Sequence, residues 1–243
     1  MQKTVIPIVV AVILALSFVV VANIFSNTAV SIKNKGYVTV KGYAKQELKS
    51  DLGIFKATIT AENPDLKACY AQLAADRDKV KIYLGKKYDV TGKELEISPA
   101  GIKEVYKINE RGFETDEFVK YELLQQLKVE SNDVEKIEAI SSNIIDVLNE
   151  GVKIFIQQPQ YVYTRLEDLK VEMIGRATDN ARERALKIAK EGKFRLGPIA
   201  SVRVGIFQIT PANSTEVSDY GFNDTTSIDK EIKSVVEIKY FVK

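Results

Sequence analysis

Residues 52–62 read LGIFKATITAE, and the alternation of side chains in this stretch decides the class of fold. On one face of the extended chain every residue is apolar, whereas the other face is mostly polar. This period of two indicates a β-strand with one face against a core and the other toward solvent. The apolar face holds Phe55, Ala57, Ile59 and Ala61, and the other face holds Ile54, Lys56, Thr58 and Thr60.

The period changes directly after this strand. Residues 63–65 read NPD, in which the asparagine or the aspartate can cap a helix and the proline suits its first turn. The following side chains predict an amphipathic helix of about five turns that ends near Gly85. Cys69 lies beside its apolar stripe, so we expect a buried structural thiol; an exposed redox thiol is the alternative. The stripe holds Leu66, Tyr70, Leu73, Arg77, Val80 and Leu84.

Further extended segments lie on both sides of this strand and helix. Residues 94–109 and 117–130 flank a short polar turn, which predicts an antiparallel hairpin. Residues 210–227 are rich in Asn, Ser, Thr, Asp and Gly, and this composition indicates a long loop. The other segments with the character of strands are residues 37–40, 152–156, 161–164, 199–209 and 232–242.

Two more helices complete the prediction. The second follows the capping sequence SND at residues 131–133 and ends at Gly151, and the third runs from Leu166 to Glu191, where Gly192 stops it. Strands and hairpins separated by helices predict an α+β fold with a mostly antiparallel sheet and three amphipathic helices. The inward sets are Val134, Ile137, Ile140, Ile144, Ile145 and Leu148 in the second helix and Leu169, Ile174, Ala177, Ala181, Ala185 and Ile188 in the third.

The N-terminal stretch from Val5 to Ile24 carries no charge over 20 residues. A helix of this length is about 30 Å long, which matches the hydrocarbon core of a bilayer. Its length favours an uncleaved signal anchor, while a signal peptide cleaved after Ala22 is the alternative. We therefore predict an anchor and tether over residues 1–30 and a folded domain over residues 36–243. The expected location is the inner (cytoplasmic) membrane, single-pass, with the C-terminal domain in the periplasm or extracytoplasmic space.

The composition excludes several kinds of chemistry. The chain has no histidine and one cysteine, so it can build neither a Ser-His-Asp site nor a cysteine zinc site. The carboxylate pairs Asp116-Glu117 and Glu167-Asp168 lie at element boundaries, and no glycine-rich phosphate loop is present. A net charge of +2 gives no reason to expect nucleic acid as a partner. We expect no enzyme activity, and we assign no catalytic, cofactor-binding or metal-binding residues.

Several stretches of the chain match a known family in combination: VTVKGYA at 38–44 with the strand at 52–62, the strand at 119–129 with SNDVEKI at 131–137, ATDNARERA at 177–185 with FRLGPI at 194–199, and the terminal alternating strand. Together they resemble the SIMPL domain family, which includes bacterial periplasmic immunogenic proteins. The resemblance extends from Gly36 to Lys243. It implies an envelope protein with an N-terminal signal, no established catalytic residues and, in some members, ring-like oligomers or a link to oxidative stress tolerance. The long anchor departs from the cleavable signals of many bacterial members.

Two functions are consistent with these features. The first is a membrane-anchored, non-catalytic envelope protein that assembles into a homo-oligomer. The second is a small-ligand-binding module in which the loop at residues 210–227 acts as a lid. The third helix is basic, which indicates either a solvated face or a contact surface for anionic lipid or a neighbouring subunit. Its cations are Arg176, Arg182, Arg184, Lys187, Lys190 and Lys193.

Overall fold

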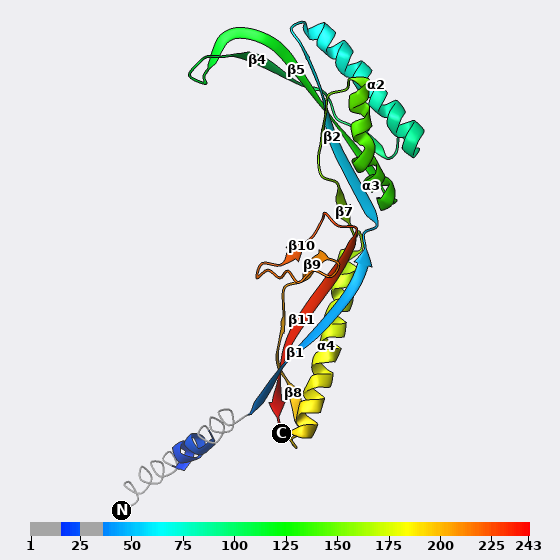
Figure 1. The fold of residues 1–243 in the computed structure, drawn as a ribbon. Helices are drawn as coiled ribbons and strands as arrows, with labels where there is room; N and C mark the ends of the chain where they lie inside the picture. Colours follow the sequence, from blue (N-terminus) through cyan, green and yellow to red (C-terminus); the bar gives the residue numbers. More distant parts are fainter. Residues whose placement is uncertain (1–15, 25–35) are drawn as a thin grey trace, which may run out of the picture. The chain divides into compact units, whose positions relative to one another are not determined.

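A computed structural model describes residues 16–24 and 36–243 of the chain (Figure 1). The chain divides into two compact units. We call the first, with residues 1–44, 172–205 and 234–243, the terminal unit. We call the second, with residues 45–171 and 206–233, the central unit. The α+β class predicted from the sequence is confirmed, since both units combine strands that are mainly antiparallel with helices.

The central unit is built on the strand whose side chains alternate at residues 52–62. This strand, β2 (Leu52–Asn63), pairs antiparallel with β5 (Glu114–Ser131), with Phe55 opposite Val129 and Ala57 opposite Leu127. The face with Phe55 is buried, as the alternation predicts. The helices α2 (Leu66–Tyr88) and α3 (Val134–Asn143) pack against these strands. The shorter strands of the sheet are β3 (Leu95–Ile97), β4 (Gly101–Ile108), β6 (Ile154–Ile156) and β7 (Gln160–Val162).

The predicted hairpin is confirmed as β4 and β5, but the extended segment at residues 94–109 is interrupted. Between β3 and β4 lie residues 98–100, where Pro99 has no N–H to donate to a neighbouring strand. The turn between β4 and β5 is closed by the Asn109 side chain, which accepts the N–H groups of Arg111 and Phe113.

Helix α2 begins as predicted and ends later than predicted. The Asp65 carboxylate accepts the N–H of Ala68 as an N-cap, and Pro64 precedes the cap instead of occupying the first turn. Gly85 does not end the helix, which continues to Tyr88 and stops at Asp89 with a φ of 52°. The Tyr88 hydroxyl donates to the Ala139 carbonyl on α3, and this contact ties the last turn of α2 to the neighbouring helix.

The second helix changes its geometry before it ends. After α3 the chain forms a 3₁₀ segment, η1 (Ile144–Glu150), and Gly151 closes it with a φ of 80°, as predicted. The predictions for Ile145 and Leu148 were wrong, because these side chains are 56% and 43% exposed. With three residues per turn, the segment buries Ile144 and Val147 instead.

The terminal unit combines parts of three long elements with one edge strand. These are β1 (Tyr37–Lys49), α4 (Leu166–Glu191), β8 (Leu196–Val204) and β11 (Asp229–Val242); β1, α4 and β11 begin or end in the central unit. The predicted bounds of α4 are confirmed. Its buried residues follow steps of four, so Met173 and Ala189 are buried while Ile188, predicted to face inward, is exposed. The whole buried set is Leu169, Met173, Ala177, Ala181, Ala185 and Ala189.

The strand predicted at residues 199–209 is two strands. The chain leaves β8 at Gly205 and resumes as β9 (Gln208–Pro211), and β10 (Phe222–Asn223) pairs parallel to β9 inside the predicted loop. The strands form one sheet in the order β1-β11-β9-β10, with β8 also paired to β11. β1 continues nine residues beyond the predicted run at 37–40, to Lys49.

Most of the predicted anchor, Val5 to Ile24, lies outside the described residues. Residues 16–24 are helical, and the Asn23 amide donates to the Val19 carbonyl at 3.0 Å. Within residues 16–24 and 36–243, no helix combines the length and the apolar character that a membrane crossing requires.

Candidate functional site

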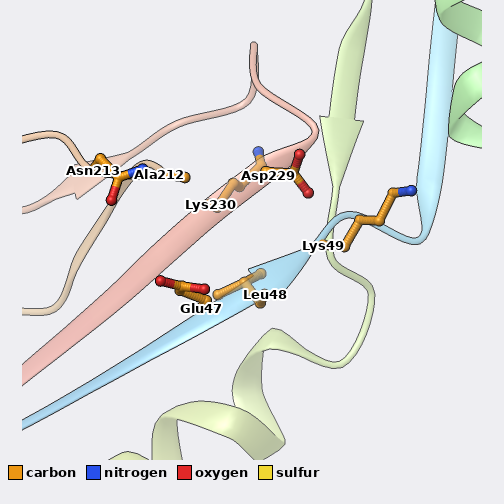
Figure 2. A pocket seen from close by; sticks show the side chains of 7 residues that line it. All are labelled: Glu47, Leu48, Lys49, Ala212, Asn213, Asp229 and Lys230. Atoms are coloured by element: carbon orange, nitrogen blue, oxygen red, sulfur yellow. The ribbon is translucent and has the colours of Figure 1, made fainter.

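Two adjoining cavities of about 430 and 470 Å³ form an open groove in the central unit. They share Lys49 at the end of β1, Ala212 after β9 and Asp229 at the start of β11. Figure 2 shows Glu47 and Asp229 on β1 and β11, which are neighbours in the sheet, with Asn213 across from them. We call this hollow the β11 groove.

Backbone hydrogen bonds fix one wall of the β11 groove. Between β1 and β2 the chain turns at Ser50, whose N–H donates to the Ile228 carbonyl at 2.9 Å. The next residue, Asp51, accepts the N–H and the hydroxyl of Thr164 at 2.7 and 2.9 Å. The first bond holds the turn against the segment before β11, and the other two hold it against the segment before α4, so Lys49 and Asp229 keep their places in the groove.

The opposite wall comes from the segment predicted to be a loop. Ala212 donates its N–H to the Asp229 carbonyl at 3.1 Å, and Asn213 adopts a φ of 63°. The Lys233 ammonium donates to the Ser214 carbonyl at 2.8 Å. Hydrogen bonds therefore hold residues 212–214, which follow β9, against β11, and this segment forms a fixed edge of the groove.

Most of the charged side chains that line the groove are acidic. Glu47, Asp229 and Glu138 are exposed, and Glu135 pairs with the Lys49 ammonium at 2.7 Å. The hydrogen bond that the Lys49 ammonium donates to Glu135 raises the pKa of Lys49, so the lysine stays charged and neutralises one carboxylate. The groove is left with a surplus of negative charge, which favours positively charged ligands.

Beneath the groove a lysine is buried among oxygen atoms. Lys230 is 2% exposed, and its ammonium donates to the carbonyls of Tyr161, at 2.8 Å, and Asp224. Burial lowers the pKa of Lys230, and the Asp224 carboxylate at 4.0 Å opposes that shift. Burial alone would raise the pKa of Asp224, but hydrogen bonds from Thr226 and Ser227 outweigh it and lower the pKa.

A second buried carboxylate lies on the opposite face of β11. Glu231 is 1% exposed and pairs with Lys45 and, at 3.0 Å, with Lys233. Burial alone would raise the pKa of Glu231, yet the hydrogen bonds from the two lysines prevail and lower it. Opposite Glu231 on β9, the buried Thr210 hydroxyl has no hydrogen-bond partner among the described residues. Buried, paired charges on both faces fix the start of β11 against β9 and β1.

Residues 38–240 match the SIMPL family, described as a protein of unknown function (DUF541). The match runs from the second residue of β1 almost to the end of β11 and so includes both units. The chain belongs to the SIMPL family. A search of the curated proteins found no match.

The SIMPL domain places the carboxylate pairs noted in the sequence away from the β11 groove. Glu117 pairs with Lys107 in the β4–β5 hairpin at 2.9 Å, and Glu167 pairs with Lys170 in the first turn of α4 at 2.7 Å. In the part of the chain that the structure describes, no three acidic or cysteine side chains are grouped to hold a metal ion. The buried role predicted for Cys69 is confirmed, since its Sγ donates to the Ala61 carbonyl at 3.2 Å.

Sequence reasoning missed the buried charges of the SIMPL domain. The prediction for the last strand began at Ile232 and left out Lys230 and Glu231, because charged residues ahead of an alternating strand usually belong to a solvated turn. The available signal of a buried charged site was that Lys230 and Glu231 are adjacent in the sequence DKEI at 229–232. Neighbouring residues of a strand lie on opposite faces, and two charges placed in this way can both be buried only when each has a partner.

Proposed function

We propose that this SIMPL protein is a non-catalytic structural protein of the cell envelope that self-assembles. Residues 5–24 would hold it in the inner membrane, with the domain outside the cytoplasm. The observation that carries the assembly is the edge strand β8, which pairs on one side with β11. Every residue from Pro198 to Val204 on this strand is exposed.

The side chains of β8 support an apolar contact with another subunit. Val202 and Val204 lie opposite Ile238 and Val236 on β11, so they share the face that is buried in β11. On β8 that face is accessible, and Val202 and Val204 are 52% and 43% exposed. An edge strand with an apolar face is a template for pairing with a second copy.

Light scattering of the full-length protein in detergent tests this assembly. We expect a mass of at least two subunits, and we expect Val202→Lys to shift the protein toward monomer because the substitution places a charge on the apolar face. Ser201→Lys is the matched control, since Ser201 is exposed on the opposite face of the same strand. A wild-type protein that remains monomeric at every concentration would contradict the proposal.

The anchor is supported by the length and the uncharged character of residues 5–24. The mass of the protein purified from membranes tests it, because cleavage after Ala22 would remove the segment. An intact N-terminus in the membrane fraction is the expected result, and a protein beginning at Asn23 in the soluble fraction would contradict it.

We also propose a link to oxidative stress tolerance, which rests on the resemblance to other SIMPL proteins alone. Cys69 is buried, so the protein's thiol is not accessible to act as the sensor. Survival in peroxide after deletion of the gene tests the link, and a strain that survives as well as its parent would count against it.

The β11 groove favours a second function, the binding of small cationic ligands. A polyamine such as spermidine carries the positive charges that Glu47 and Asp229 would attract. We expect spermidine to raise the melting temperature of the full-length protein, since a ligand that binds the native state stabilises it. Asp229→Asn should abolish the rise, while Glu216→Gln, outside the groove, should leave it unchanged. Equal rises in both variants would rule out the groove.

A further inference from the structure

The charges of the chain are divided unevenly between its two units. The described residues of the terminal unit contain 11 lysines and arginines against 5 acidic residues, a net charge of +6. The central unit contains 21 against 28, a net charge of −7. Lys3, Lys33 and Lys35 lie outside the described residues and bring the whole chain to +2. The small net charge of the whole chain therefore conceals a basic terminal unit. Its first described strand, β1, follows the predicted anchor and tether in the sequence.

Among the residues that the structure describes, none covers one face of the sheet in the terminal unit, which we call the open face. Helix α4 packs on the other face, where Gly42 meets Ala177 and Ala181. Strand alternation turns the side chains next to these buried positions outward, and Tyr37, Tyr43 and Lys41 on β1 are 45%, 41% and 70% exposed. The open face holds Tyr37, Lys41 and Tyr43 from β1, Lys239 and Phe241 from β11, and Arg203 from β8.

Aromatic rings and cations lie next to each other on this open face. The Lys239 ammonium lies 4.1 Å from the centre of the Tyr37 ring, which is 5.0 Å from the Phe241 ring. Lys41 and Arg203 approach the same carboxylate, that of Glu237, at 3.9 and 4.0 Å. The three cations thus outnumber the carboxylate beside them, and tyrosine and basic side chains together are typical of surfaces at the boundary between membrane and water.

We propose that the open face of the terminal sheet binds the anionic headgroups of the phospholipid bilayer that holds residues 5–24. This inference rests on the membrane anchor proposed above. Residues 25–35 link the anchor to the start of β1, and even a fully extended link of this length reaches about 40 Å. The tether therefore keeps the open face at a high effective concentration near the lipid surface, where weak contacts with phosphate suffice.

Charge favours lipid over a second copy of the chain on this face. Two copies packed face to face would place Lys41, Lys239 and Arg203 of one against the same three cations of the other. Such an arrangement of like charges is unfavourable, whereas a layer of phosphodiester groups offers each cation a partner.

A fluorophore on the full-length protein in vesicles tests the inference. Thr39→Cys places the label on the open face, and Glu183→Cys places it on the exposed side of α4 as the control. Cys69 is buried and does not compete for the label. The vesicles contain phosphatidylcholine alone or an equal mixture with phosphatidylglycerol, and both carry a trace of lipid with a nitroxide quencher on its headgroup.

We expect quenching at residue 39 to be about twofold stronger in the anionic vesicles. The difference should vanish in high salt and in the variant that combines Lys41→Glu with Lys239→Glu, because both remove the attraction to phosphate. Residue 183 should show no such difference. Equal quenching of residue 39 in the two kinds of vesicle, or a lipid-dependent change at residue 183 instead, would overturn the inference.

Flotation of the same vesicles separates this inference from the anchor. Protein that floats with both lipids, without anionic quenching at residue 39, would retain the anchor and refute the lipid face. Protein that floats with anionic vesicles alone would refute the anchor and support the lipid face. Self-quenching between labels at residue 39 in both lipids would show a second copy on this face, and would also refute the inference.

Discussion

At Gly42 the strand β1 and the helix α4 approach so closely that no side chain fits between them. A Cβ atom on Gly42 would lie 1.9 Å from the Ala177 carbonyl oxygen and 2.7 Å from the Ala181 Cβ. The clash is with backbone and with a short side chain, so neither can turn away. The close packing of α4 on β1 therefore requires a glycine at position 42 and small residues at positions 177 and 181.

We expect Gly42→Ala to lower the free energy of unfolding by about 3 kcal/mol, because the helix must move away from the strand. Urea unfolding of the full-length protein in detergent, followed by circular dichroism, measures the change. Gly101→Ala is the matched control, since its Cβ would lie 3.8 Å from the Leu124 carbonyl oxygen in ordinary contact. Two variants of equal stability would show that β1 and α4 are not packed in this way.

A single carboxylate should make the stability of the protein fall as the solution becomes acid. A hydrogen bond from the Thr91 backbone, together with the Lys136 ammonium at 2.9 Å and the Ser131 hydroxyl, lowers the pKa of Glu94 to about 2. The folded pKa lies below the ordinary value of 4.5. The stabilisation is therefore complete above pH 4.5 and is lost as the pH falls toward 2.

We expect the wild-type protein to lose about 2 kcal/mol more than Glu94→Gln between pH 6 and pH 3. Urea unfolding at the two pH values measures the difference. Glu96→Gln is the control, because Glu96 is 75% exposed and its pair with Lys128 lies at the surface. A loss in Glu94→Gln as large as in the wild type would contradict the assignment.

Among the elements, those with one strict period were predicted best. The buried face of β2 and the bounds of α4 followed from repeats of two and about four residues, which reflect one buried face along the whole element. The errors lie where the geometry changes within an element, as at Ile145 after α3, or where partners are distant in sequence. Lys230 donates to the carbonyl of Tyr161, 69 residues earlier in the chain, so the adjacent charges of Lys230 and Glu231 were a local signal of burial that did not identify this partner.

Because the chain changes from α3 to the 3₁₀ segment η1, Val147 should contribute more to stability than Ile145. A continuous α-helix would predict the opposite order. Val147 is buried and Ile145 is 56% exposed. We expect Val147→Ala to lower the free energy of unfolding by about 2 kcal/mol, since it leaves a cavity, whereas Ile145→Ala should cost less than about 0.5 kcal/mol. Thermal unfolding of the two variants measures both changes. A greater loss in Ile145→Ala would place an α-helix at residues 144–150.

For the whole molecule, assembly through β8 should be visible in hydrogen exchange. We expect the amides of β8 to exchange about tenfold faster in Val202→Lys than in the wild type, because the edge strand loses its partner. The amides of β5, which pairs with β2 from Tyr121 to Ser131, should exchange equally in both proteins. Mass spectrometry of the full-length proteins in detergent measures this. Unchanged exchange in β8 would mean that assembly uses another surface.

The first and last strands are neighbours in one sheet, and the Val242 N–H donates to the Gly36 carbonyl at 2.9 Å. This pairing joins the two ends of the folded chain, so it has a consequence for the order of events during synthesis. The strands β2 and β5 and their helices lie within residues 52–143 and can pair while later residues are still being added. β1 must wait for β11, which follows all the other described strands in the sequence. β1 would therefore be the last of these strands to gain its partner, and a chaperone bound to it would act after the rest of the described chain has folded.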